Sequence, residues 1–266
     1  MDLKNTILKT LPADHRWQIH FLDEVDSTNI WAGRLAREGA PEGTICIADH
    51  QLKGKGSRGR SWESPKGEGI FMSLVLRPEI RPEEAPMLTL LCACSLAAVL
   101  DEEFHIPVEI KWPNDLVLNK KKVTGILTEM SAQPGMVEHC IVGVGINVGM
   151  EHFPKELEDK ATSLYLETGS RPDRGMLIGR FLRQFEIDYA AFLKAKDLSP
   201  FKERYEDHLV NIGEQVRIIS GGVTPEWRGE ALGIDSFGAL LVKTDEGQIK
   251  KVVSGEVSVR GLYSYT

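Results

Sequence analysis

Four apolar segments follow one another between residues 108 and 148, with only short polar turns between them. They cover residues 108–112, 116–118, 123–130 and 137–148. Val, Ile and Leu are frequent in each segment, which is typical of strands. A parallel pair of strands needs a connection of about a dozen residues, whereas the polar turns at 119–121 and 133–135 are far shorter. The sheet is therefore predicted to be at least partly antiparallel.

Helices and a second strand-rich region flank these segments. The predicted helices cover residues 83–103, 174–194 and 200–209, with one more after Ser27, and further strands lie near residues 20–22, 44–50 and 70–76. Beyond Asn211 the pattern changes to short strands with Gly or Asp turns, which is typical of a small β-barrel or sandwich. We therefore expect an α+β fold with two domains, residues 1–211 and 212–266.

Charge and apolar content exclude several kinds of protein. The 266 residues carry 32 basic and 39 acidic side chains, a net charge of −7, so no nucleic-acid partner is expected. The chain start has no apolar signal segment, and the longest apolar run, residues 88–100, is shorter than the roughly 20 residues of a membrane span. A cytoplasmic protein without a membrane partner is expected. The four cysteines and seven histidines form no metal-binding pattern, so no side-chain metal cluster is predicted.

Two cationic segments interrupt this acidic chain. Residues 53–66 contain five basic residues against Glu63, and residues 111–122 contain four against Asp115. Their concentration suggests a small anionic ligand. For either segment alone, a solvated turn is the simpler interpretation.

The first cationic segment contains the glycine-rich run Gly54–Trp62, GKGSRGRSW. It superficially matches three phosphate-binding loops. The dinucleotide and Walker loops both need a helix directly after the glycines, which is not predicted here, and Arg60 replaces the Walker lysine. The kinase loop is excluded because no other kinase motif follows. Glycines still let backbone N–H groups approach an anion that the interleaved cations neutralise, and Trp62 offers a flat apolar wall. A surface hairpin with a basic tip remains the alternative.

The second segment joins two strands through a hairpin. Pro113 fixes the exit from the first strand, and Asn114 and Asp115 then lie in a turn, where they cap the backbone or bind a ligand or cation. Lys122 opens the next strand. Gly125 in that strand, like the glycines of Gly143-Val144-Gly145, suggests close approach of a ligand or of backbone.

Together these motifs resemble the biotin protein ligase family. The resemblance rests on Asp26–Asn29, Gln51–Trp62, Lys111–Asp115, Lys122–Leu127, Gly143–Asn147 and Gly255–Arg260, in the family's order. It implies a catalytic domain like that of class II aminoacyl-tRNA synthetases, with a mixed or antiparallel sheet, followed by an SH3-like β-barrel. Only about twenty residues precede the resemblance, so we expect no N-terminal DNA-binding domain.

The resemblance implies an ATP-dependent ligase. Biotin would attack ATP, in the presence of Mg²⁺, to give biotinyl-5′-AMP, and a lysine of a biotin carboxyl carrier protein domain would then take the biotinyl group. A lipoate–protein ligase is the alternative within this chemistry, and a non-catalytic biotin or nucleotide sensor is the alternative outside it. The presence of Lys122 and Asn114-Asp115 favours catalysis. Bacterial members often form dimers, so the choice between a monomer and a homodimer is left open at this point.

The resemblance also implies roles for individual residues. Lys122 would bridge the carboxylate and the α-phosphate as the main electrostatic catalyst, with Arg60 and Asp115 as further catalytic groups. The biotin site would contain Ser27, Thr28, Asn29, Gln51, Lys55, Gly56, Ser57, Trp62, Lys122 and Gly125. The nucleotide site would contain Arg58, Arg60, Lys111, Asn114 and Asn147. Ser57 departs from the family pattern, which usually has arginine there.

Overall fold

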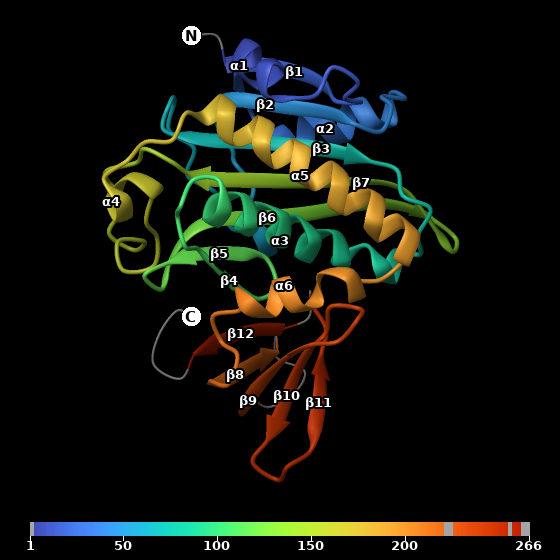
Figure 1. Cartoon of the computed structure of the whole chain (residues 1–266), viewed down its shortest axis with the longest axis vertical. Coiled ribbons are helices and arrows are strands. Elements are labelled where there is room, and N and C mark those ends of the chain that lie inside the picture. The colour runs from blue at the N-terminus through green and yellow to red at the C-terminus, as the bar shows by residue number, and fades with distance from the viewer. Residues whose placement is uncertain (1–2, 221–225, 255–256, 262–266) are drawn as a thin grey trace.

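The computed structural model describes residues 3–220, 226–254 and 257–261, which form two β-sheets (Figure 1). The larger sheet has seven strands in the order β1-β2-β3-β7-β6-β5-β4. They are β1 (Gln18–Val25), β2 (Thr44–Gln51), β3 (Gly69–Leu76), β4 (Glu109–Lys111), β5 (Asp115–Leu118), β6 (Lys121–Gln133) and β7 (Met136–Asn147). β1 and β2 pair parallel and the other neighbours pair antiparallel, which confirms the predicted mixed sheet.

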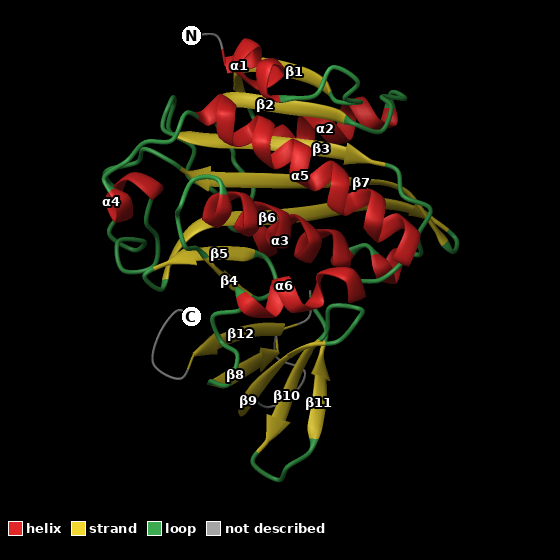
Figure 2. Cartoon of the chain, viewed as in Figure 1, coloured by secondary structure: helices red, strands yellow, loops and turns green. Residues whose placement is uncertain are grey.

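Helices pack on both faces of this sheet (Figure 2). On one face lie α3 (Pro86–Glu102) and α5 (Arg174–Ala195), with α1 (Leu3–Thr10) against α5. On the other face α2 (Thr28–Arg37), the crossover between β1 and β2, packs over β2, β3 and β7. Side chains along β2 point alternately to the two faces of the sheet. Ile45 and Ile47 therefore join the main core, whereas Cys46 joins the smaller apolar cluster under α2.

The apolar helix α3 lies in the centre of the main core. Its residues from Met87 to Leu100 are all buried, mainly against α5 and β6. By length and composition alone, residues 82–102 would suffice to cross a membrane, but 78% of their most apolar window is buried inside the fold. The composition of α3 therefore follows from its place between the sheet and α5.

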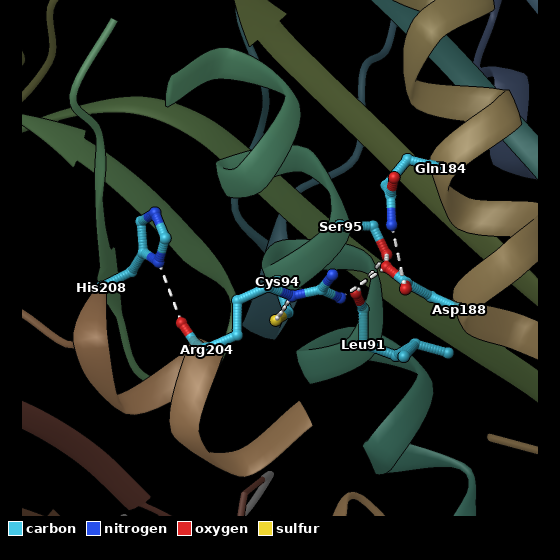
Figure 3. Close-up of polar contacts among 7 residues, drawn as sticks. All are labelled: Leu91, Cys94, Ser95, Gln184, Asp188, Arg204 and His208. Atoms are coloured by element: carbon cyan, nitrogen blue, oxygen red, sulfur yellow. Dashed lines mark hydrogen bonds and ion pairs between the residues drawn. The ribbon is translucent and has the colours of Figure 1, made fainter. Parts of the chain in front are cut away.

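A polar network around the ion pair of Arg204 and Asp188 joins α3, α5 and α6 (Lys202–Asp207), as Figure 3 shows. Arg204 Nη2 lies 2.6 Å from Asp188 Oδ2, and Asp188 is only 4% exposed. Ser95 Oγ and Gln184 Nε2 also donate to this carboxylate, at 2.6 and 3.0 Å. A buried charge is tolerated when it is paired and hydrogen-bonded, so this network fixes α6 against the core.

The second sheet begins directly after α6. It is antiparallel, in the order β11-β10-β9-β8-β12, with β8 (Gln215–Ser220), β9 (Trp227–Ile234), β10 (Leu240–Thr244), β11 (Ile249–Val252) and β12 (Val257–Gly261). Several hydrogen bonds tie it to the first part of the chain; among them, Trp112 Nε1 donates to Gly238 O at 3.0 Å, Leu198 N to Ser236 O at 2.7 Å, and Ile234 N to Glu206 Oε1 at 2.9 Å. The strand-rich pattern predicted beyond Asn211 is thus confirmed.

The four cysteines are free and buried, as predicted. Burial raises the pKa of Cys46 and that of Cys140 to about 12. Among the described residues no group of three or more His, Cys, Asp or Glu side chains could hold a metal ion.

Candidate active site

Two glycines on neighbouring strands form a flat floor on the α2 side of the sheet. Gly125 of β6 and Gly145 of β7 are direct partners in the ladder. The Trp62 indole lies on both, because a Cβ at either position would come within 2.6 Å of a ring carbon. The glycines were expected to allow close approach of a ligand or of backbone; the group that approaches them is instead a side chain, Trp62 of the cationic segment.

A polar wall stands beside this floor at the start of α2. Gln51 Oε1 accepts from Thr28 N at 2.8 Å and from Thr28 Oγ1 at 3.1 Å, and Gln51 Nε2 donates to Ser64 Oγ at 2.9 Å. Ser27 is the N-cap residue of α2, but its hydroxyl makes no capping hydrogen bond. The wall thus presents short hydroxyl and amide groups at one end of the floor.

The amide of Asn29 is held by the protein at both ends. Its Oδ1 accepts from Ser73 Oγ at 2.6 Å, and its Nδ2 donates to Glu129 Oε2 at 2.9 Å. Gly143 makes room for it, since a Cβ there would collide with Oδ1. Asn29 therefore shapes the wall, with little hydrogen-bonding capacity left for a ligand.

Lys122 lies at the other end of the floor. Its Nζ is 2.5 Å from Asp115 Oδ1 and 5.2 Å from the centroid of the Trp62 ring. Backbone bonds fix the strand here, with Lys122 N donating to Lys160 O at 2.8 Å. The side chains of Lys122 and Asp115 are 22% and 10% exposed, so the ammonium group of Lys122 is held by its ion pair and is largely shielded from water.

The cationic run forms a narrow hairpin over the floor. Gly56 N donates to Arg60 O at 2.7 Å and Trp62 N to Gly54 O at 2.8 Å. Arg58 sits near the tip with φ of 59°, a left-handed conformation that is uncommon outside glycine. The Lys55 ammonium pairs with Glu129 Oε1 of β6 at 3.0 Å, which connects the hairpin to the sheet.

Three adjoining cavities meet at this hairpin, and Ser57 lines all of them. The head cavity, between the polar wall and Trp62, holds about 30 Å³. A crevice of about 340 Å³ lies beside the part of β6 that continues past its pairing with β5. It is lined by Arg58, Arg60, Lys111, Asn114, Asp115, Thr89, Ser254 and Val259, among others. An apolar side cavity of about 140 Å³ lies beyond Lys122 and is lined by Phe153, Leu157 and Ala161, among others.

The structure brings most of the predicted site residues together. All ten residues predicted for biotin line the head cavity: Ser27, Thr28, Asn29, Gln51, Lys55, Gly56, Ser57, Trp62, Lys122 and Gly125. Four of those predicted for the nucleotide line the crevice: Arg58, Arg60, Lys111 and Asn114. The fifth, Asn147, instead borders the apolar side cavity, and its Nδ2 donates to Thr162 O at 2.9 Å.

Several residues of the site were not predicted. Glu129 continues β6 two positions after Leu127, and its carboxylate gave no motif signal. Phe153 and Leu157 come from an irregular segment without periodicity, so only the fold brings them beside Lys122. Ser254 reaches the crevice from the second sheet, more than a hundred residues from Lys111 along the chain.

Comparison with known proteins identifies a family. Two family models match the chain: the biotin/lipoate A/B protein ligase family over residues 22–147, and the biotin protein ligase C terminal domain over residues 212–260. The chain is 41% identical over 239 residues to the bifunctional ligase/repressor BirA of Bacillus subtilis, covering 89% of this chain and 72% of that protein. It is 33% identical over 250 residues to the biotin–[acetyl-CoA-carboxylase] ligase of Mycobacterium tuberculosis, covering 90% and 88%.

A solved structure of a biotin protein ligase is also similar to this chain. A biotin protein ligase from Aquifex aeolicus, in complex with biotin and ATP, superposes with a TM-score of 0.78 at 35% identity. The match covers 93% of this chain and 100% of that one.

Proposed function

Because the chain belongs to the biotin protein ligase family, we propose that it activates biotin with ATP as biotinyl-5′-AMP and transfers the biotinyl group to a protein lysine. One observation carries the proposal. All ten residues assigned to biotin from sequence line a single cavity, and Lys122 stands where that cavity meets the side cavity, with the cationic crevice adjoining.

The head cavity suits a ring with both hydrogen-bond donors and acceptors. The ureido group of biotin can donate to and accept from the hydroxyl and amide groups of the polar wall, including the Ser27 hydroxyl, which makes no capping hydrogen bond, whereas the dithiolane ring of lipoate has neither N–H donors nor a carbonyl acceptor. This favours biotin over lipoate. A volume of about 30 Å³ holds only a few water molecules, so biotin enters when Trp62 lifts from the glycine floor.

The adenylation step needs positive charge at the reacting phosphorus. A carboxylate oxygen of biotin attacks the α-phosphate, and the bond from that phosphorus to the bridging β-oxygen breaks to release pyrophosphate. Lys122 then faces the oxygens on which negative charge develops, and Asp115 keeps its ammonium group in place. Arg60 lines both the crevice and the side cavity, so it can follow the charge that leaves with pyrophosphate.

The two outer cavities suit two parts of ATP. The crevice carries Arg58, Arg60 and Lys111, which fit a polyphosphate, and the start of α3 lies at its wall. The side cavity is lined by Trp62, Phe153 and Leu157, which fit a flat base. Mg²⁺ would arrive bound mainly to phosphate oxygens, since the described part of the chain offers no cluster of three metal-binding side chains.

In the transfer step the acceptor lysine attacks the acyl carbon of the mixed anhydride, and AMP leaves. The names of the relatives from Mycobacterium tuberculosis and Paracoccus denitrificans specify acetyl-CoA carboxylase, so we infer a biotin carboxyl carrier protein domain as the acceptor. We further infer that the seven-stranded part is related to class II aminoacyl-tRNA synthetases and that the second sheet is SH3-like. Both are supported by the mixed sheet and by the small antiparallel sheet that follows.

The test is exchange of labelled pyrophosphate into ATP, with biotin or lipoate as the only carboxylate. We expect exchange with biotin and none with lipoate. Exchange with lipoate alone would reassign the head cavity, and binding of biotin without exchange would favour the sensor.

A further inference from the structure

Glu129 occupies a position that no motif of the chain marked, between the polar wall and the cationic hairpin. It lies on β6 on the same face as Gly125, because side chains two and four positions apart share a face of a strand. Its two carboxylate oxygens have different partners: Oε2 accepts from Asn29 Nδ2 at 2.9 Å, and Oε1 pairs with Lys55 Nζ at 3.0 Å.

The hairpin needs such a counter-charge to close. Residues 53–63 contain Lys53, Lys55, Arg58 and Arg60 against the single acid Glu63, so the segment repels itself. Within the described residues, the ion pair from Lys55 to Glu129 crosses from this hairpin to the sheet. It therefore offsets part of the repulsion whenever the hairpin lies closed against the sheet.

We propose that Glu129 is a positioning residue that latches the cationic hairpin over bound biotin and the adenylate, and that also orients Asn29 in the wall. The inference rests on the proposed function, since it assigns a task within the same site. Glu129 acts through Lys55 and Asn29 and has no assigned contact with the reacting atoms.

Two substitutions separate the two contacts. In Glu129→Gln the amide oxygen still accepts from Asn29, but the charge that attracts Lys55 is lost. In Glu129→Ala both contacts are lost. Glu138→Gln is the matched control, because Glu138 lies on the adjacent strand, is 45% exposed against 41% for Glu129, and contacts Ser131 and the neighbouring His139 instead of the hairpin.

The measurements are trypsin cleavage within the hairpin and the release rate of labelled biotinyl-adenylate without acceptor. Glu129→Gln should raise both by about two- to five-fold, the usual range for a half-exposed ion pair, and should raise the KM for biotin by no more than the same factor. Glu129→Ala should raise the KM for biotin further, because it also removes the contact with Asn29. Glu138→Gln should match wild type in all three.

A double-mutant cycle with Lys55→Met gives the decisive result. If the two residues act as a pair, Glu129→Gln should not change the release rate further once Lys55 is Met. Two results would overturn the latch: equal rates of adenylate release from wild type and Glu129→Gln, or fully additive effects of Glu129→Gln and Lys55→Met on that rate. Neither result would affect the proposed function, provided that the wild-type protein still catalyses biotin-dependent exchange. Absence of biotin-dependent exchange in wild type would instead overturn the proposed function.

Discussion

Replacing Gly145 by alanine should damage the biotin site without damaging the fold. The added Cβ would lie 2.6 Å from Trp62 Cε2 and 2.7 Å from its Nε1, whereas carbon atoms pack best at about 3.5–4.0 Å. The same methyl group would stand in the space that biotin takes when Trp62 lifts from the floor, so the bound ligand would have to lie about 1 Å farther from the sheet. Overpacking of this kind costs about 1–3 kcal/mol, or about a 5- to 150-fold loss in affinity.

The assay is calorimetric titration with biotin together with the KM for biotin in pyrophosphate exchange. We expect both constants to rise by that factor, with a melting temperature close to wild type, because the methyl group points at the hairpin and away from the main core. Gly33→Ala is the control: its Cβ would meet nothing closer than 3.6 Å, so it should leave biotin binding unchanged. A Gly145→Ala protein that binds biotin as wild type does would refute the idea that the floor has to be bare backbone.

Four further predictions test the catalytic group, the hairpin and the core. Lys122→Ala should lower the exchange rate by ~10²–10³ while biotin binding remains measurable by calorimetry, and exchange within a few-fold of wild type would contradict its role. Ser57→Arg should slow adenylate release about 10-fold or more by adding a charge-assisted hydrogen bond, whereas unchanged release would mean that this position does not hold phosphate. Arg204→Met should lower the free energy of unfolding in urea by about 3 kcal/mol, since it leaves a buried carboxylate without its cation; a loss below 1 kcal/mol would contradict this. Cys46 and Cys140 should resist iodoacetamide in the native protein at about pH 8, because their pKa of about 12 keeps them protonated, and rapid labelling would show that they are accessible.

Some site residues can be found from local pattern alone, because they lie in short runs that are unusual for structure, such as glycines inside strands and cations between glycines. Gly125, Gly145 and the Gly54–Trp62 run were predicted for this reason, and the fold brings them into direct contact. Others, such as Ser27, Thr28, Asn29 and Gln51, were expected only because of the family resemblance.

The residues that escaped prediction depend on contacts far apart in sequence. Glu129 looks like any exposed carboxylate until Asn29 and Lys55 are placed beside it, 100 and 74 residues earlier in the chain. The helix α1 escaped for a similar reason. Eight residues make a marginal helix alone, but Thr6 packs closely against Gly175 of α5, where a Cβ would come within 2.6 Å.

The crevice has one consequence for how this enzyme could have been assembled in evolution. One wall comes from Lys111 in the first part of the chain and another from Ser254 in the second sheet, although the two parts match separate family models. Neither part carries the whole crevice, so exchanging the second sheet with that of a relative would replace part of the proposed ATP site as well. The two modules are therefore expected to be inherited and to change together, as the halves of a single enzyme.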